Sequence, residues 1–257
     1  MFTPEAIRAL ALSSIAGFST MIGAVVVIFI KKKSDKLITA SLGFAGGVML
    51  SVSFIELLPN AESYLTRCTD RRLGVLVTVL SLVVGILFST LLDRFVPHQE
   101  VSEEGEREHM NLFRVGIISA LAIWLHNFPE GIATFMAGYS DTSLGITIAV
   151  AISMHNIPEG LAVAMPIYVS TGSKKKAFKY TFLSAIAEPV GALLAFAVLR
   201  PFINDMLMGI VFAFIAGIMI YIAIEELIPS SRQYGHKGLA LFSVFFGICL
   251  MPLANIF

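Results

Sequence analysis

Two segments of the chain carry histidine, asparagine and glutamate at the same spacing. The octapeptide HNFPEGIA begins at His126 and HNIPEGLA begins at His155, with six of eight positions identical. Residues four apart share one face of an α-helix, so His126 points the same way as Glu130, and His155 the same way as Glu159. The repeat therefore predicts two matching helix faces, each carrying an imidazole and a carboxylate.

An asparagine borders each of these faces, because Asn127 lies three residues before Glu130 and Asn156 lies three before Glu159. If the two helices run antiparallel and face each other, two imidazoles, two amides and two carboxylates meet. Such nitrogen and oxygen donors suit zinc, iron(II), cobalt, manganese and cadmium. Calcium and magnesium prefer all-oxygen shells, and copper(I) prefers sulfur. The set therefore predicts a site for borderline divalent ions.

The helices that position these residues belong to a strongly apolar chain. Of 257 residues, 56% are hydrophobic and 14% are charged, and the mean hydropathy is +0.83. A soluble domain of this length cannot bury that much apolar surface, which excludes a soluble enzyme, a disordered chain and a nucleic-acid-binding protein. The formal net charge of zero gives no reason to expect a polyanionic partner. The sequence indicates a protein surrounded by the lipid bilayer.

Eight stretches are long and apolar enough to cross a bilayer as helices. They cover residues 7–30, 37–59, 73–96, 112–138, 144–168, 177–200, 205–228 and 238–257. An even number places both termini on one side. With the termini outside, thirteen Lys and Arg residues fall in inner segments and five in outer segments. Because cytoplasmic loops are enriched in Lys and Arg, we expect both termini outside the cytoplasmic (inner) membrane.

A second, more distant repeat relates the two ends of the chain. The stretch from Gly46 to Pro59 resembles the stretch from Ala216 to Pro229. In the predicted topology these stretches cross the membrane in opposite directions, which is typical of the inverted repeats of secondary transporters. The fold class predicted is all-α integral membrane: one transmembrane transporter domain, residues 1–257, with spans 1–3 and 6–8 as inverted repeats around spans 4 and 5.

Six glutamates lie inside the predicted spans, and no Lys or Arg lies well inside any of them. Ionised groups in the bilayer core are costly unless they are paired or hydrated, so an imported cation is the expected partner. Glu56 near one mouth, and Glu225 with Glu226 near the other, are candidates for an ion pathway; ordinary interfacial charge is the alternative. At midplane, Glu130, Glu159 and Glu188 carry a charge of −3. One divalent ion leaves −1 and two leave +1, which suggests two adjacent ions.

Proline follows the ligand positions in a fixed register. Pro129 and Pro158 have no N–H to offer the carbonyl four residues earlier, so each helix is expected to be kinked or locally opened beside its ligands. Gly131 and Gly160 are expected to let another helix come close. Trp124 is expected to face away from the ligands and to serve in packing.

Residues 97–111 form the longest polar connection and are expected on the cytoplasmic side. They contain five glutamates with His98 and His109. The segment is interpreted either as a solvated linker or as a weak metal-binding loop. The two cysteines, Cys68 and Cys249, lie in different contexts, so neither a disulfide framework nor a zinc–thiolate site is expected.

With its doubled HNxPEG motif on spans four and five of eight, the chain resembles the ZIP metal-ion transporters, most closely the bacterial ZupT-like zinc-uptake branch. The resemblance implies import of divalent metal, often with broad selectivity, by an eight-helix bundle with a central binuclear site. It further implies a homodimer and an elevator-like motion of the metal-bearing helices. The first ion would be held by His126, Glu130, His155 and Glu159, and the second by Asn127, Asn156 and Glu188, with Glu130 and Glu159 bridging. Metal ions are then cargo, and no resident cofactor is expected.

Two other functions use part of the same pattern. A channel or proton-coupled transporter for cations would need the carboxylates but not two His-x-x-x-Glu pairs, and its transport would be insensitive to zinc. An intramembrane zinc hydrolase would use His-Glu-x-x-His, in which the glutamate after the histidine is the base. Asn127 and Asn156 occupy that position and cannot act as bases, so an enzyme is not expected.

Overall fold

The computed structural model describes residues 3–30, 34–95, 104–199 and 204–254, and every regular element in these ranges is a helix. The elements are α1 (Pro4–Phe29), α2 (Asp35–Val52), η1 (Ser53–Leu57), α3 (Leu58–Cys68), α4 (Arg71–Phe95), α5 (Glu104–Ser140), α6 (Thr142–Thr171), α7 (Lys174–Ala185), α8 (Ala187–Leu194), η2 (Ala195–Leu199), α9 (Asp205–Ile222), η3 (Ala223–Leu227), α10 (Ile228–Ser231) and α11 (Lys237–Ala254). The labels η1 to η3 denote π-helical turns.

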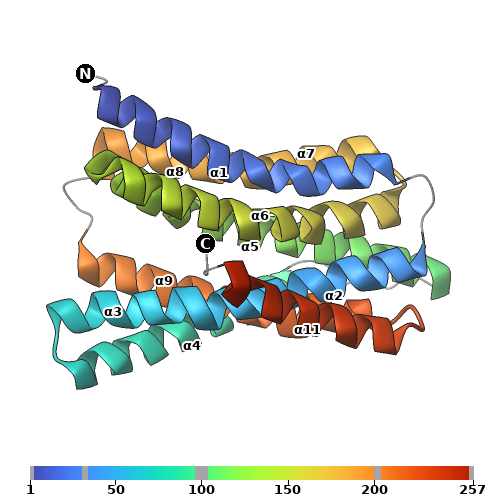
Figure 1. Ribbon diagram of the computed structural model, residues 1–257. Coiled ribbons are helices and arrows are strands. Elements are labelled where there is room, and N and C mark those ends of the chain that lie inside the picture. The colour runs from blue at the N-terminus through green and yellow to red at the C-terminus, as the bar shows by residue number, and fades with distance from the viewer. Residues whose placement is uncertain (1–2, 31–33, 96–103, 200–203, 255–257) are drawn as a thin grey trace.

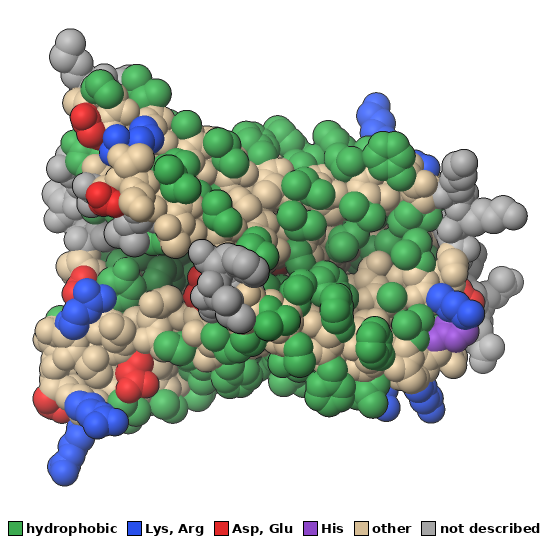
Figure 2. Space-filling view, in the orientation of Figure 1, with side chains coloured by type: hydrophobic (Ala, Val, Ile, Leu, Met, Phe, Trp, Pro, Cys, Tyr) green, Lys and Arg blue, Asp and Glu red, His purple; other side chains and the backbone are tan. Residues whose placement is uncertain are grey.

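Several of these elements join end to end into longer rods. Within the described residues, seven helical stretches are long and apolar enough to cross a membrane, and Lys237–Leu253 is a shorter apolar helix. Hydrophobic side chains cover the middle of the molecule in Figure 2, and most charged side chains lie toward its two ends. The protein is therefore a multi-pass helical membrane protein, as the composition predicts.

The rods pack as two layers, which are visible in Figure 1. One layer contains α1, α5, α6 and the α7–α8 rod, and the other contains the α2–α3 rod, α4, the α9–α10 rod and α11. Helices contact one another chiefly within a layer, and the main contact between the layers is that of α2 with α6. Both glutamate-bearing octapeptides, and Glu188 on α8, belong to the first layer.

Glycines of the octapeptides allow the close packing of this layer. A Cβ atom on Gly131 would collide with the Glu188 carbonyl oxygen, and one on Gly160 would collide with the Thr20 carbonyl oxygen. Only glycine can take such positions without displacing a neighbouring backbone. The expectation that these two glycines admit a neighbouring helix is confirmed, with α8 as the neighbour of Gly131 and α1 as that of Gly160.

Proline has different consequences at different places in the chain. Helices α5 and α6 continue through Pro129 and Pro158 without an interruption of the helix. In contrast, π-helical turns at Ser53–Leu57 and Ala223–Leu227 stand just before Pro59 and Pro229. In these turns the N–H of Leu58 donates to the Ser53 carbonyl and the N–H of Ile228 to the Ala223 carbonyl, five residues back, and the proline without an N–H follows directly. The two turns occupy equivalent positions of the distant sequence repeat, and their rods run in opposite directions in Figure 1.

Two boundaries differ from those predicted. The second rod continues beyond Pro59 to Cys68, because the proline stands in the first turn of α3, where its missing N–H is tolerated. Helix α5 begins at Glu104, so half of the segment 97–111 is helical. The described part of α11, Lys237–Ala254, agrees with the predicted start of the last span, and the predicted end at residue 257 lies outside the described residues.

Candidate metal centre

The two octapeptides meet at the centre of the first layer, where α5 and α6 pack antiparallel. The Oε1 atom of Glu130 lies 3.0 Å from Nε2 of His126 and 3.0 Å from Nε2 of His155. The Oε1 atom of Glu159 lies 3.5 Å from Nε2 of His126. Ligand atoms of His126, Glu130 and His155 all lie within 4.8 Å of one another, a spacing at which one ion can touch all three. The predicted meeting of the two faces is confirmed as geometry.

These side chains are buried, and most of their oxygens have no hydrogen-bond donor. His155 and Glu159 are 0% exposed, and Glu130 is 5% exposed. Within the described residues, both carboxylate oxygens of Glu159 and Oε2 of Glu130 have no hydrogen-bond partner. Buried acceptors without donors are costly. Two imidazoles and two carboxylates are metal ligands that fit a borderline divalent ion, and such an ion would bind the oxygens that have no hydrogen-bond partner.

A second polar group adjoins the first. The Nδ2 atom of Asn156 donates a hydrogen bond to Oε1 of Glu188, and another, at 2.9 Å, to the carbonyl oxygen of Ala16. Asn127 donates instead to the Ser184 carbonyl oxygen at 3.5 Å. The Oδ1 atoms of both asparagines and Oε2 of Glu188 have no hydrogen-bond partner in the described part of the chain. Asn156 and Glu188 are thus brought together, whereas Asn127 is turned toward the backbone of α7.

Helix α1 packs against the backbone that carries Glu188, a contact that the sequence alone does not reveal. The hydroxyl of Ser13 lies 3.4 Å from the carbonyl oxygens of both Gly131 and Glu188. A Cβ atom on Gly17 would lie 2.7 Å from Cβ of Glu188. Small residues on α1 therefore fix the position of the backbone that carries Glu188. Their spacing resembles ordinary helix packing, so no sequence signal points to this role.

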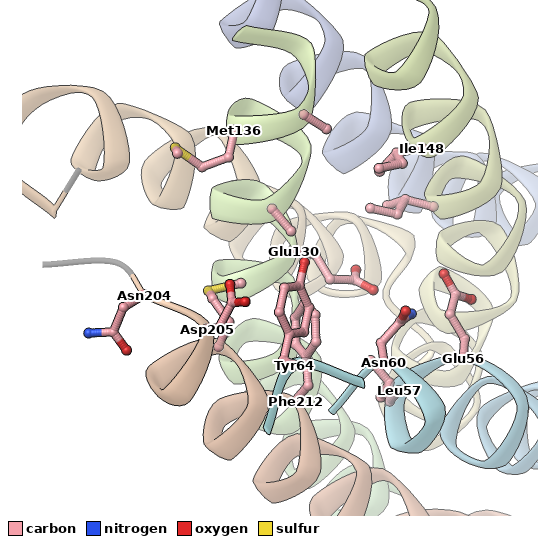
Figure 3. Close-up of a pocket in the computed structure, with 14 residues that line it drawn as sticks. Glu56, Leu57, Asn60, Tyr64, Glu130, Met136, Ile148, Asn204, Asp205 and Phe212 are labelled. Carbon is pink, nitrogen blue, oxygen red and sulfur yellow. The ribbon is translucent and has the colours of Figure 1, made fainter. Parts of the chain in front are cut away.

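A cavity of about 450 Å³ leads to the cluster from the end of the bundle where α1 begins. Arg8 of α1 identifies that end, because its Nη2 donates to the Gly138 carbonyl oxygen at 3.0 Å. Figure 3 shows the polar lining of the cavity, which includes Glu56, Asn60, Tyr64, Glu130, Asn204 and Asp205. Glu130 therefore belongs both to the buried cluster and to the wall of the cavity.

Glu56 lies nearer to the cluster than its predicted place at the mouth of the pathway. Its Oε2 atom lies 3.8 Å from Nδ1 of His155, and its side chain is 30% exposed in the cavity. The π-helical turn η1 carries it there from the other layer. His155 thus stands between two carboxylates, Glu130 at Nε2 and Glu56 at Nδ1.

At the opposite end, the expectation that the protein supplies no positive charge to the intramembrane glutamates needs correction. The Nη1 atom of Arg114 on α5 lies 3.4 Å from Oε1 of Glu226 on η3, with side chains 15% and 8% exposed. Arg114 stands near the start of its span, and its long side chain reaches inward. The neighbouring Glu225 is exposed. Glu226, unlike Glu225, is therefore a buried and paired carboxylate.

The remaining features singled out in the sequence are two histidines, two cysteines and a tryptophan. His98 lies outside the described residues, and His109 lies on the described part of α5 without a described side chain. Cys68 and Cys249 are both free and exposed. Trp124 is 39% exposed and stacks on Phe128, in keeping with its expected packing role.

Comparison with known proteins places this geometry in a family. The family model described as "ZIP Zinc transporter" matches residues 97–255. The zinc transporter ZupT of Streptococcus mutans is 43% identical over 249 residues, which cover 95% of this chain and 94% of that protein. The zinc transporter ZupT of Chlorobaculum parvum is 44% identical over 256 residues, covering 96% of each chain. That of Clostridium perfringens is 40% identical over 270 residues, covering 96% and 95%.

Proposed function

The chain belongs to the ZIP zinc transporter family, a family of transport proteins rather than enzymes, and we propose that it imports zinc and related divalent ions through the centre on α5, α6 and α8. One observation carries the proposal. The buried group of His126, Glu130 and His155 lies at the end of an open cavity, and Glu130 belongs to both. An ion that enters the cavity meets Glu130 first among the three.

The first ion is held by His126, Glu130 and His155, whose ligand atoms lie within 4.8 Å of one another, together with Glu159, whose Oε1 lies 3.5 Å from Nε2 of His126. The second is held by Glu188 with the side-chain oxygens of Asn156 and Asn127, and Glu130 and Glu159 bridge the two ions. The three carboxylates carry −3, so two divalent ions leave +1, nearer to balance than an empty site. The oxygens that have no donor in the described part of the chain support this assignment. Asn127 has to leave the Ser184 carbonyl to take part.

The cargo is one of the transition metals that accept both nitrogen and oxygen ligands: zinc, iron(II), manganese, cobalt or cadmium. Imidazole favours zinc over the harder ions, and calcium or magnesium would require an oxygen shell that this centre does not offer. The names of the relatives point to zinc as the first cargo to test.

Transport proceeds by alternating access, with the two layers moving against each other. In the described conformation the cavity opens at the end where α1 begins, and we assign that end to the outside. Glu56 is the carboxylate of the cavity wall next to His155, and it passes the ion to the buried ligands. Glu225 and Glu226 stand at the cytoplasmic end of the path. Relative movement of the layers is supported by their packing, because contacts between them are few beside those within each layer.

The topology belongs to the same proposal. Residues 1–257 form one transporter domain of eight spans in the cytoplasmic membrane, with both termini outside, and it works as a homodimer. Spans 1–3 and 6–8 are inverted repeats around spans 4 and 5. The π-helical turns η1 and η3, at equivalent positions of the two repeats, support this relationship, as do the opposite directions of their rods.

Uptake of radiolabelled zinc into proteoliposomes tests the function. We expect saturable uptake that unlabelled manganese, cobalt and cadmium reduce, and that equal concentrations of calcium and magnesium leave unchanged. Liposomes without protein are the control for leakage. Potassium or proton flux that zinc does not inhibit, without saturable zinc uptake, would favour a cation channel instead.

A further inference from the structure

The two ends of the bundle differ: a cavity opens at one end, and a buried ion pair lies at the other. At the end where α1 begins, a cavity of about 450 Å³ runs to Glu130. At the other end, the guanidinium of Arg114 contacts the carboxylate of Glu226. Arg114 precedes His126 by twelve positions on α5, which places it about 18 Å along the helix from the metal centre. The centre therefore lies between an open end and an ion-paired end.

This ion pair joins the two layers of the fold. Arg114 belongs to α5, which carries half of the metal centre, whereas Glu226 belongs to η3 in the other layer. Both side chains are largely buried, at 15% and 8% exposure. Charges in such surroundings attract strongly, and either one is costly to bury alone. If one layer moves past the other, the two side chains of this pair have to separate.

A second ion pair in the described part of the chain lies at the cavity end and is exposed to solvent. Arg67 lies 3.7 Å from Asp205 near the mouth of the cavity, with side chains 57% and 44% exposed. Both residues belong to one layer, on α3 and α9. Solvent screening makes such a pair weak, and relative movement of the layers does not separate it. It therefore offers a matched comparison for the buried pair.

We propose that Arg114 is a built-in counter-cation for Glu226 that closes the far end of the ion path. The guanidinium holds the carboxylate while the cavity is open at the other end. The pair separates when the metal centre turns to the far end, and Glu226 then offers its carboxylate to the departing divalent ion. On return, Arg114 displaces that ion and closes the path. The proposal rests on the transport function proposed above and adds a residue to it.

Cysteine accessibility measures the closed end directly. In a background with Cys68→Ser and Cys249→Ser, Ser119→Cys reports on the far side of the centre, since Ser119 is 0% exposed and lies two turns from His126 toward Arg114. Ala137→Cys reports on the cavity that it lines. The rates at which a small maleimide labels each cysteine, in purified protein without metal, give the balance between the two open states.

We expect Arg114→Gln to raise labelling at Ser119→Cys by roughly tenfold or more and to lower it at Ala137→Cys, because the buried carboxylate loses this partner. Glu226→Gln should likewise raise labelling at Ser119→Cys and lower it at Ala137→Cys. The exchange Arg114→Glu with Glu226→Arg should restore both rates to near those of the parent. The matched control Arg67→Gln should change neither rate.

Unchanged labelling in Arg114→Gln, with a monodisperse elution profile, would overturn the proposal. If a single variant does not fold, the double variant Arg114→Glu with Glu226→Arg tests the proposal instead. Fast labelling at Ser119→Cys in the folded double variant would also overturn the proposal. Labelling does not depend on transport. Failure of the parent protein to take up zinc would therefore remove the transport function while leaving the accessibility result readable.

Discussion

The Oε1 atom of Glu130 lies 3.0 Å from Nε2 of His155, and each residue comes from a different copy of the same octapeptide. The contact exists because α5 and α6 run antiparallel with only Asp141 between them, so equal motifs cross near their midpoints. The contact makes the two octapeptides one site rather than two.

The first prediction concerns the imidazoles. His126→Ala and His155→Ala should each weaken zinc binding by roughly tenfold or more, and should weaken manganese binding less, because manganese depends less on nitrogen ligands. Equilibrium competition with a fluorescent chelator measures both affinities. An equal loss for the two metals would require revision of the ligand assignment.

The second prediction concerns the number of ions. The purified protein should bind two zinc ions at saturation, and Glu188→Ala should bind one with the first affinity retained. Asn156→Ala removes the amide that contacts Glu188 and should alter selectivity among metals more than it lowers the rate of uptake. Elemental analysis after equilibrium dialysis gives the ratio. A ratio of one in the parent protein would refute the two-ion arrangement.

A third prediction concerns Glu56 in the cavity wall. Glu56→Gln should raise the zinc concentration for half-maximal uptake more than it lowers the maximal rate, because the residue meets the ion before the buried ligands do. Glu62→Gln is the control, since Glu62 is exposed and lines a separate groove on α3 and α4. A fall in maximal rate alone would place Glu56 in the conformational step instead.

The fourth prediction concerns packing. Gly131→Ala places a methyl group against the Glu188 carbonyl and should destabilise the protein by about 1–3 kcal/mol, as overpacked cores do. Gly238→Ala is a matched control, because a Cβ atom there meets nothing within 4 Å. Thermal unfolding in detergent compares the two. Equal melting temperatures for both variants and the parent would show that α5 and α8 can separate at little cost.

The sequence predicts the meeting of the two octapeptides because the information for it is local. A histidine four residues before a glutamate fixes their common face in any α-helix, and the short connection at Asp141 fixes the antiparallel pairing. The glycine after each glutamate likewise predicts a close neighbour, and both neighbours are present. Neither inference needs knowledge of distant parts of the chain.

The sequence predicts Glu56 and Arg114 less well for two separate reasons. Glu56 is misplaced because its span is predicted to end at residue 59, whereas the rod continues to Cys68 and leaves Glu56 well inside it. Arg114 is counted as a charge near a span end, yet its long side chain reaches inward to Glu226. Pro59, which is predicted to end a helix, stands instead within a rod that continues to Cys68. The role of α1 depends on tertiary contacts alone.

The measurement that tests the central claim most directly is zinc uptake into proteoliposomes by the parent protein and by the variant Glu130→Ala with Glu159→Ala. Glu62→Ala is the matched glutamate control. We predict saturable uptake by the parent and by Glu62→Ala, and none above protein-free liposomes by the double variant, because both bridging carboxylates are gone. Uptake by a folded double variant equal to that of the parent would contradict the account and would make the buried cluster a structural feature.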